Sequence, residues 1–435
     1  MPIKSLEETQ MSSGIKTAAA MTVGCRLNQA DTALIFGRLR EAGYEIVGPD
    51  TDGPLDVIII NSCAVTASAS QTSRNFVRAC RRNHPEAKVI VTGCDSEVEK
   101  EFWQNEKSVD IYLPNPEKSK IMDYINGPLP KREAANEKIF MENSTGFYPF
   151  RCRAFIKIQE GCDNFCTYCI VPYARGSERS RHHAEIITEF GNLLAHGHKE
   201  IVLAGVNVSA YRDNSYGLSE LLSRLLEFEG DYRIRLSSTE PHKDNIKLIP
   251  LMKDNPKICR FLHLPLQHGS DEILKLMGRK YTAEEFAEFA HMALSGIPGL
   301  HLGTDVICGF PGETAELFEK SCRFMESIPF ANLHVFSFSP RKGTPAADFE
   351  DHVLPAEMKD RHLRLEALEG RLADKFLDAQ VGRTLKVLIE KVRHDGEAEG
   401  WSDNYIRVIS HVENAKRNSF ADVLIKEKAG KILKG

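Results

Sequence analysis

The sequence predicts an α/β protein in three parts, and three observations lead to this prediction. Strand-like and helix-like segments alternate three times near the N-terminus and six times in the centre of the chain, and short strand-like segments between turns fill its end. Strands that alternate with helices predict parallel sheets, whereas short strands between turns predict a small β-barrel. At 435 residues the chain is also too long for one ordinary hydrophobic core.

The first expected domain, residues 16–127, is a βαβ domain with a parallel sheet. Its three expected strands are TAAAMTV, LDVIIINS and KVIVTG, and they lead into Cys25, Cys63 and Cys94. Helices are expected from about Gln29 to Ala42, with Asn28 able to cap the first turn, and from about Ser68 to Asn83. Because the carboxyl ends of parallel strands meet at one edge of a sheet, the three cysteines are predicted to converge there. Each cysteine taken alone also fits a small buried hydrophobic residue.

Residues 128–151 are Pro-rich and then charged, which predicts a linker. Residues 152–354 contain six expected strand–helix units, which predict an open, partial (βα)6 barrel with its active site at the carboxyl ends of the strands. The expected strands are RAFIKI, EIVLAG, RIRLSS, RFLHLP, LGTDVIC and LHVFSF. A connecting helix is expected at 355–379 and the small β-barrel at 380–435.

A tight run of three cysteines, Cys162, Cys166 and Cys169, follows the first strand of the central part. Cysteine thiolates are the usual ligands of iron–sulfur clusters, and three ligands on a four-iron cluster leave one iron open for a cofactor. A structural zinc site is the alternative, but it needs a fourth ligand, and only His182 and His183 lie near in the sequence. An inert buried position is the other alternative.

The composition is that of a soluble globular protein, with 42% hydrophobic residues, 27% charged residues and a formal charge of -5. This balance argues against a general nucleic-acid coat but not against a local basic face. No apolar run reaches the length of a membrane span, and the polar start lacks the pattern of a signal peptide. We therefore expect a cytoplasmic protein without membrane contact, whose eleven cysteines are ligands and core residues rather than disulfides.

The cysteine-containing segments resemble the methylthiotransferases of the radical S-adenosylmethionine (SAM) superfamily. The similarity rests on VGCRLNQADT, NSCAVT and VTGCDS, on RAFIKIQEGCDNFCTYCIVPYARGSERSR, and on FLHLPLQHGSDEILKLMGRKYT, TDVICGFPGE and HVFSFSPRKGTPAA, so it covers nearly the whole chain. Within the family, GCRLNQ and NSCAVT are most similar to the branch that acts on N6-threonylcarbamoyladenosine in tRNA. The isopentenyladenosine branch tends to show GCQMN, and the ribosomal-protein branch GCPKN.

The resemblance implies two 4Fe–4S clusters and SAM as cofactors. Cys25, Cys63 and Cys94 would hold an auxiliary cluster, and Cys162, Cys166 and Cys169 would hold the cluster that binds SAM. The further residues that the resemblance places near SAM are Tyr168, Gly205, Asn207, Ser238, Glu240, Gln267 and Gly309. Strand-end capping or turn chemistry is the alternative role for these residues. Arg279 and Tyr281 face a similar choice between helix-end packing and substrate contact.

The end of the chain resembles the TRAM domain, an RNA-binding β-barrel. Residues 380–435 contain 11 Lys and Arg against 8 Asp and Glu, so this part is basic while the whole chain is acidic. Trp401 and Tyr405 are predicted to stack on unpaired bases, with a place in the core as the alternative. Arg341 is the candidate partner of the threonylcarbamoyl carboxylate, because a planar guanidinium suits that group; an ordinary surface arginine is the alternative.

The function that the resemblance implies is the transfer of a methylthio group to carbon 2 of N6-threonylcarbamoyladenosine beside the anticodon. One SAM would methylate sulfur on the auxiliary cluster, and a second would be cleaved to an adenosyl radical that removes the ring hydrogen. No side chain is expected to act as a catalytic acid or base. The expected partners are the tRNA anticodon stem-loop and an electron donor such as flavodoxin or ferredoxin. The alternatives are a sister enzyme acting on isopentenyladenosine or a ribosomal protein, and an RNA-binding iron–sulfur redox sensor.

Overall fold

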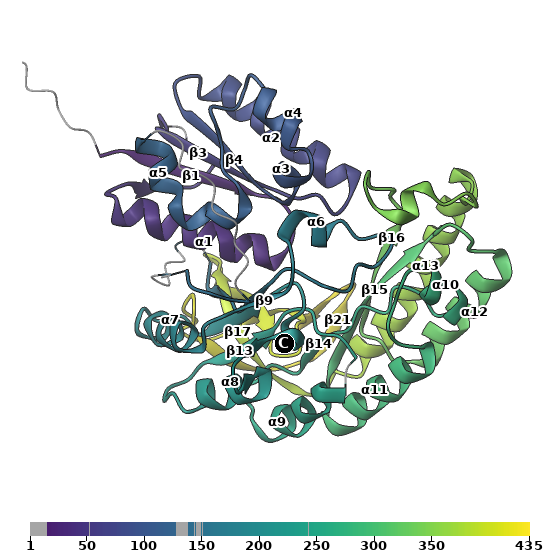
Figure 1. Ribbon diagram of the computed structural model, residues 1–435. Coiled ribbons are helices and arrows are strands. Elements are labelled where there is room, and N and C mark those ends of the chain that lie inside the picture. The colour runs from purple at the N-terminus through teal and green to yellow at the C-terminus, as the bar shows by residue number, and fades with distance from the viewer. Residues whose placement is uncertain are drawn as a thin grey trace, which may run out of the picture.

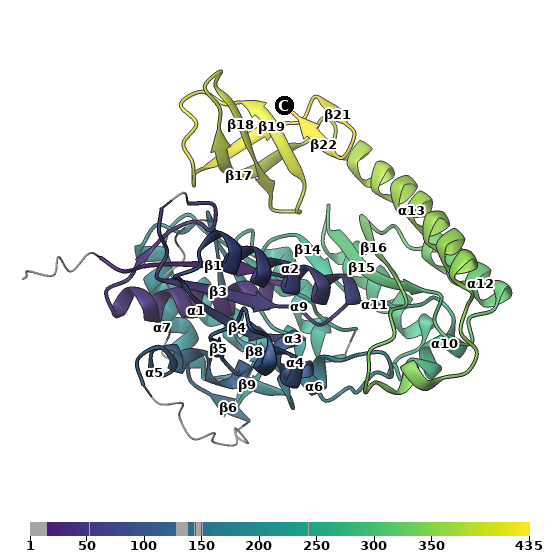
Figure 2. The ribbon, with the colours of Figure 1, turned by 90° about the horizontal axis from the view of Figure 1, so that it is seen from above.

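The computed structural model describes residues 15–51, 53–127, 138–142, 144, 149, 151–241 and 243–435. An N-terminal sheet lies above a central half-barrel in Figure 1, and Figure 2 shows a C-terminal sheet beside the half-barrel. In the described part of the chain, no helix has the length and apolar character needed to cross a membrane.

The N-terminal sheet has five parallel strands in the order β2–β1–β3–β4–β5. Buried side chains on both faces explain the near-continuous apolar sequences of its central strands. Helices α1 and α5 cover one face, and α2 and α4 cover the other. The elements are β1 (Thr17–Thr22), α1 (Arg26–Glu41), β2 (Glu45–Ile46), β3 (Val57–Ser62), α2 (Ala67–Asn83), β4 (Lys88–Gly93), α3 (Cys94–Val98), α4 (Lys100–Asn105), β5 (Ile111–Tyr112), the 3-10 helix η1 (Asn115–Lys120) and α5 (Ile121–Asn126).

Three predicted strands and both predicted helices of this domain are confirmed, whereas the two-residue edge strands β2 and β5 were not predicted. The prediction that Asn28 caps the first helix is wrong. The helix begins at Arg26, with Cys25 in the cap position, and Asn28 is completely buried within it. Its side chain has another role, which is described with the site below.

The six strands of the half-barrel run parallel in the order β7–β10–β13–β14–β15–β16, with isolated bridges joining β13 to β14. All six are the predicted ones. Their bounds are β7 (Arg153–Lys157), β10 (Glu200–Ala204), β13 (Arg233–Leu236), β14 (Phe261–His263), β15 (His301–Cys308) and β16 (Asn332–Ser337). An apolar layer between these strands and the outer helices forms the largest core of the protein.

Some of the outer helices begin at a residue whose side chain caps the first turn. The hydroxyl of Thr282 accepts a bond from the backbone N–H of Glu285 at 3.1 Å, and Glu285 accepts one in return, so the two residues form a capping box. The helices are α6 (Val171–Arg175), α7 (His183–Ala195), α8 (Leu218–Leu226), α9 (Leu248–Asp254), α10 (Asp271–Leu276), α11 (Ala283–Gly296) and α12 (Ala315–Ser327), with 3-10 turns at Val208–Ala210, Lys243–Lys247 and Pro345–Asp348.

Most of the predicted linker lies outside the described residues. Within it, however, β6 (Ile139–Phe140) is a strand that pairs with β9 (Arg179–Arg181), which in turn pairs with β8 (Gln159–Glu160). A short hairpin of β11 (Arg212–Asp213) and β12 (Tyr216–Gly217) lies between β10 and α8 in the sequence.

The long helix α13 (Pro355–Asp378) leads from the half-barrel to the C-terminal sheet, as Figure 2 shows. Its residues Leu365, Leu368 and Leu372 belong to the core of the half-barrel, whereas Leu377 belongs to the C-terminal core. The curled C-terminal sheet has the order β20–β17–β18–β19–β22–β21. Its strands are β17 (Thr384–Val392), β18 (Glu397–Ser402), β19 (Arg407–His411), β20 (Phe420–Leu424), β21 (Glu427–Ala429) and β22 (Ile432–Lys434).

The C-terminal sheet packs against the half-barrel through buried arginines. Arg233 and Arg235 of β13 both pair with Glu200 of β10, at 2.6 and 2.7 Å. The same guanidinium groups donate to backbone carbonyls of the C-terminal sheet, including that of Trp401 at 2.8 Å. These bonds hold β18 and the turn after it against β13 of the half-barrel.

Candidate active site

The three N-terminal cysteines lie at the carboxyl edge of the sheet, as predicted from the strand pattern. Cys25 precedes α1, Cys63 follows β3, and Cys94 begins α3. Gly24 has a φ of +103°, and a Cβ added to it would lie 2.8 Å from the Cys63 sulfur, so glycine keeps this space open. Burial, together with the neighbouring thiols Cys94 and Cys25, raises the pKa of Cys63 to about 12.

Asn28 and Arg175 join the loops that present these cysteines. The Asn28 amide donates to the carbonyls of Val23 and Ser62, at 2.7 and 2.9 Å, and its oxygen accepts from Arg175 at 2.5 Å. Arg175, at the end of α6, also donates through Nε to the Cys94 sulfur at 3.2 Å. Burial raises the pKa of Cys94, and the guanidinium of Arg175 opposes this shift because it favours the thiolate form that ligates a metal. The local sequence does not reveal this pairing, because Arg175 and Asn28 meet across the boundary between the two domains.

The second set of cysteines lines a cavity of about 250 Å³ at the carboxyl ends of the barrel strands. Cys162, Cys166 and Cys169 contribute to it together with Val65 and Thr66, which directly follow the Cys63 loop of the N-terminal domain. The two cysteine sets therefore approach each other across one interface. Three thiols beside an open cavity form a donor set that fits a cluster with one free iron.

Four of the residues predicted near SAM line this cavity: Tyr168, Asn207, Glu240 and Gln267. Arg279, whose role the sequence left open, lies beside the cysteines. It donates to the Cys166 sulfur at 3.4 Å and to Glu240 at 2.9 Å, so it joins the cysteine set to the carboxylate. Asn207 also caps the turn at Ser209, which is the alternative role considered from the sequence.

The other three residues lie elsewhere. Gly205 and Ser238 line a neighbouring cavity, and Gly309 is not among the described residues that line either one. A Cβ on Gly309 would lie 2.7 Å from the sulfur of Met358, so this glycine permits the close approach of α13.

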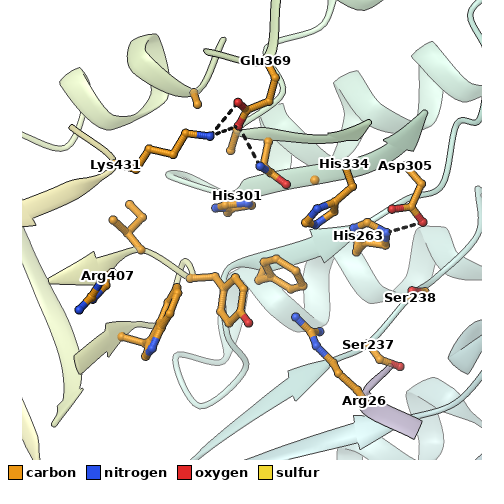
Figure 3. A pocket seen from close by; sticks show the side chains of 18 of the residues that line it. Arg26, Ser237, Ser238, His263, His301, Asp305, His334, Glu369, Arg407 and Lys431 are labelled. Carbon is orange, nitrogen blue, oxygen red and sulfur yellow. Dashed lines mark hydrogen bonds and ion pairs between the residues drawn. The ribbon is translucent and has the colours of Figure 1, made fainter. Parts of the chain in front are cut away.

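The neighbouring cavity is the lumen of the half-barrel, with a volume of about 890 Å³. Its walls come from all three parts of the chain: Cys25 and Arg26 precede or begin α1, β14–β16 supply inward-facing side chains, and Trp401 and Tyr405 come from the C-terminal sheet. Asp305 and Phe336 line both cavities, so the lumen and the cysteine cavity are adjacent. Figure 3 shows His263, His301, Asp305 and His334 around the lumen, with His263 paired to Asp305 at 3.1 Å.

The residues predicted to contact the substrate lie at the following positions. Arg341 is buried and lines neither cavity; its guanidinium donates to Ser70 at 3.0 Å and lies 3.9 Å from Asp95, so it fixes the N-terminal domain on the half-barrel. Trp401 and Tyr405 stack on each other, with ring centroids 4.8 Å apart, and form part of the lumen wall. Their stacking on unpaired bases stays a prediction, and the cavity that they line is the lumen.

Replacing Gly93 by alanine is expected to destabilise the edge that presents Cys94. Gly93 has a φ of +106°, and a Cβ there would collide with the backbone of Ser62. We expect a loss on the order of 3 kcal/mol, together with a lower iron content after reconstitution. Gly43→Ala is the matched control, because Gly43 has a φ of +86° with nothing within 4 Å. Equal melting temperatures and iron contents for the two variants would contradict the steric explanation.

Comparisons with known proteins agree with this arrangement. Residues 156–325 match the model of the Radical SAM superfamily, and residues 17–114 match that of the Uncharacterized protein family UPF0004. Over 407 residues the chain is 37% identical to the threonylcarbamoyladenosine tRNA methylthiotransferase MtaB of Bacillus subtilis, covering 90% of both chains. The chain belongs to the radical SAM tRNA methylthiotransferases.

Other relatives of this methylthiotransferase are named for one of two modified adenosines. The Thermotoga maritima MtaB is 35% identical, covering 90% of this chain and 91% of that one. A tRNA-2-methylthio-N(6)-dimethylallyladenosine synthase from Thermodesulfovibrio yellowstonii is 34% identical, covering 87% and 89%. The radical SAM methyltransferase TsrM from Kitasatospora setae shares the fold, with a TM-score of 0.57 at 14% identity, over 76% of this chain and 77% of that one. The family uses SAM and a 4Fe–4S cluster, and its N-terminal domain indicates a second cluster.

Proposed function

We propose that this methylthiotransferase converts N6-threonylcarbamoyladenosine beside the tRNA anticodon to its 2-methylthio derivative. The observation that carries the proposal is the pair of cysteine sets, in separate domains, beside two cavities that share Asp305 and Phe336. In this proposal Cys25, Cys63 and Cys94 hold the auxiliary cluster, and Cys162, Cys166 and Cys169 hold the cluster that binds SAM. Membership of an enzyme family removes the alternative of a redox sensor without turnover.

When bound, SAM and the clusters supply the adenosyl radical that removes the unreactive C2 hydrogen and the sulfur that replaces it. The chain supplies position and charge. The thiolates of both sets would be the ligands. Arg175 and Arg279 donate to the sulfurs of Cys94 and Cys166 and would offset the negative charge of the thiolates. Glu240 and Gln267 line the cavity in which they would contact the polar groups of SAM.

The lumen favours the threonylcarbamoyl substituent over an isopentenyl one. An isopentenyl group is entirely apolar, whereas the threonylcarbamoyl group has a hydroxyl, amide groups and a carboxylate. The lumen offers polar and charged partners, including Arg26, His263, Asp305 and His334. An apolar substituent there would leave the N–H groups of Arg26 without an anionic hydrogen-bond partner, which costs binding free energy.

The test is nucleoside mass spectrometry of tRNA treated anaerobically with the reconstituted protein, SAM and a chemical reductant. We expect a 2-methylthio product from tRNA with threonylcarbamoyladenosine, and at least about tenfold less from tRNA with isopentenyladenosine. Flavodoxin or ferredoxin is expected to replace the chemical reductant. Cys166→Ala is expected to form no product, whereas Cys322→Ala, at a cysteine outside both sets, retains activity. Equal or better turnover of the isopentenyl tRNA would refute the substrate assignment.

A further inference from the structure

The lumen has three lysine or arginine residues in its described lining, and two of them are paired with carboxylates. Lys431 lies 2.8 Å from Glu369, as Figure 3 shows, and Arg407 lies 2.6 Å from Glu399. Arg26 differs from both, because within the described residues no carboxylate forms an ion pair with it. Its charged and polar neighbours are Tyr405 and two further arginines.

Arg26 is held in place by a backbone carbonyl and two aromatic rings, none of which carries a negative charge. Its Nη1 donates to the carbonyl of Leu236 at 3.3 Å, and its guanidinium carbon lies 5.2 Å from the ring centroids of both Phe261 and Tyr405. Stacking on aromatic faces fixes the plane of a guanidinium and leaves its N–H edges available. Figure 3 shows Arg26 entering the lumen from the N-terminal domain, with its guanidinium directed into the cavity.

The neighbouring arginines have acidic partners of their own. Arg153 lies 2.9 Å from Glu390, and Arg235 lies 2.7 Å from Glu200. Glu390 and Glu200 therefore already have cationic partners. The positive charge of Arg26 is not balanced by either of them. A partly buried cation without a counter-ion is costly, so an anionic group bound beside it would be strongly favoured.

We propose that Arg26 binds the carboxylate of the threonylcarbamoyl group and so selects the modified nucleotide. The inference rests on the proposed function and names the contact that determines its specificity. Arg26 directly follows Cys25, so the turn that presents a thiol of the auxiliary set also presents the guanidinium. A base whose C2 edge faces the two cysteine sets would place its N6 substituent in the lumen, which adjoins the cavity lined by Cys162, Cys166 and Cys169. The planar fork of an arginine can hold both carboxylate oxygens.

The test compares two anticodon stem-loop RNAs that differ at one group. One contains N6-threonylcarbamoyladenosine, and the other contains its carboxamide, which has the same shape but no charge. We measure the Kd by fluorescence anisotropy and kcat/KM with the reconstituted enzyme and its Arg26→Gln variant. The wild type is expected to prefer the carboxylate RNA by about 10- to 100-fold in both quantities. In Arg26→Gln the ratio is expected to fall to within about threefold, with the carboxamide RNA bound as in the wild type.

Two further variants serve as controls. Arg371→Gln removes an exposed arginine that is paired with Glu326 outside both cavities and is expected to keep the wild-type preference. Arg26→Lys keeps the charge without the planar fork and is expected to have an intermediate preference. The iron content of each variant shows whether a change beside Cys25 has disturbed the auxiliary site.

Three outcomes would overturn the proposal. A wild type that binds both RNAs equally does not use the carboxylate, and this result requires no variant. An Arg26→Gln enzyme that keeps the wild-type ratio places the carboxylate contact elsewhere. A variant that weakens both RNAs equally assigns Arg26 to a backbone phosphate. Failure of the proposed function gives a different result from failure of this inference. In that case the wild type forms no methylthio product, whatever the ratio of its Kd values for the two RNAs.

Discussion

Replacing Cys25 by alanine is expected to abolish methylthio transfer while SAM cleavage continues. Cys25 belongs to the N-terminal set and lines the lumen, whereas Cys162, Cys166 and Cys169 line the other cavity. Loss of a residue that only supports a metal ligand typically lowers activity roughly 10- to 100-fold. Removing one of three ligands should lower the yield of methylthio product by more than that. The set that is proposed to bind SAM keeps all its thiols, so 5'-deoxyadenosine should still accumulate.

The measurement is the ratio of 2-methylthio nucleoside to 5'-deoxyadenosine in the same anaerobic reaction. Cys166→Ala should lose both products, and Cys25→Ala should lose only the first. Cys80→Ala is the control within the N-terminal domain, because Cys80 is buried beside Val77 and Trp103 in a hydrophobic cluster, away from the cysteine edge. Loss of 5'-deoxyadenosine in Cys25→Ala would argue against two separate roles for the cysteine sets.

Local sequence patterns predicted the positions of both cysteine sets, because these cysteines follow the carboxyl ends of strands that are recognisable in the sequence. The apolar runs that end at Cys63 and Cys94 fix where β3 and β4 end, and parallel pairing then brings the residues to one edge. The six barrel strands were predicted for the same reason. Each is a short apolar segment whose neighbours in the sequence are amphipathic helices.

The contacts between domains could not be predicted in this way. Arg341 was assigned to the substrate because its residue type suits a carboxylate, but its partner is Ser70, 271 positions away in the chain. Arg233 and Arg235 alternate with apolar residues in β13, so they lie on one face of that strand. Nothing local shows that Glu200 and the C-terminal sheet meet that face, because their positions depend on how the three parts pack.

Asp31→Asn is expected to cause the largest loss of stability at the boundary between the N-terminal domain and the half-barrel. The Asp31 carboxylate, which has no exposed surface, lies 2.6 Å from Lys118, 2.7 Å from Lys157 and 3.0 Å from Arg175. Removing its charge leaves three buried cations with fewer carboxylates, which typically costs about 3–5 kcal/mol. The melting temperature should fall by at least about 5 °C. Asp374→Asn is the matched control, because Asp374 forms an exposed pair with Lys428 at 2.9 Å.

The pH dependence of this loss follows from the direction of the pKa shift. Burial alone would raise the pKa of Asp31, but Lys118, Lys157 and Arg175 outweigh it and hold the pKa well below its usual range. The contribution of a carboxylate with a lowered pKa is complete above its unfolded value of about 4 and is lost as the pH falls below it. The difference in melting temperature between wild type and Asp31→Asn should therefore be constant from pH 8 to pH 5. A difference that disappears at pH 5 would contradict the assignment.

The same substitution should also separate the two chemical steps. Asp31 lies on α1, the helix that begins beside Cys25 and packs through Leu27 and Ala30 against Phe155 of the half-barrel. A weakened contact there should let the N-terminal cysteines move away from the lumen, whereas the cavity lined by Cys162, Cys166 and Cys169 lies mostly within the half-barrel. Methylthio product should therefore fall at least about tenfold more than 5'-deoxyadenosine. An equal fall in both would mean that Asp31 supports only the overall stability of the chain.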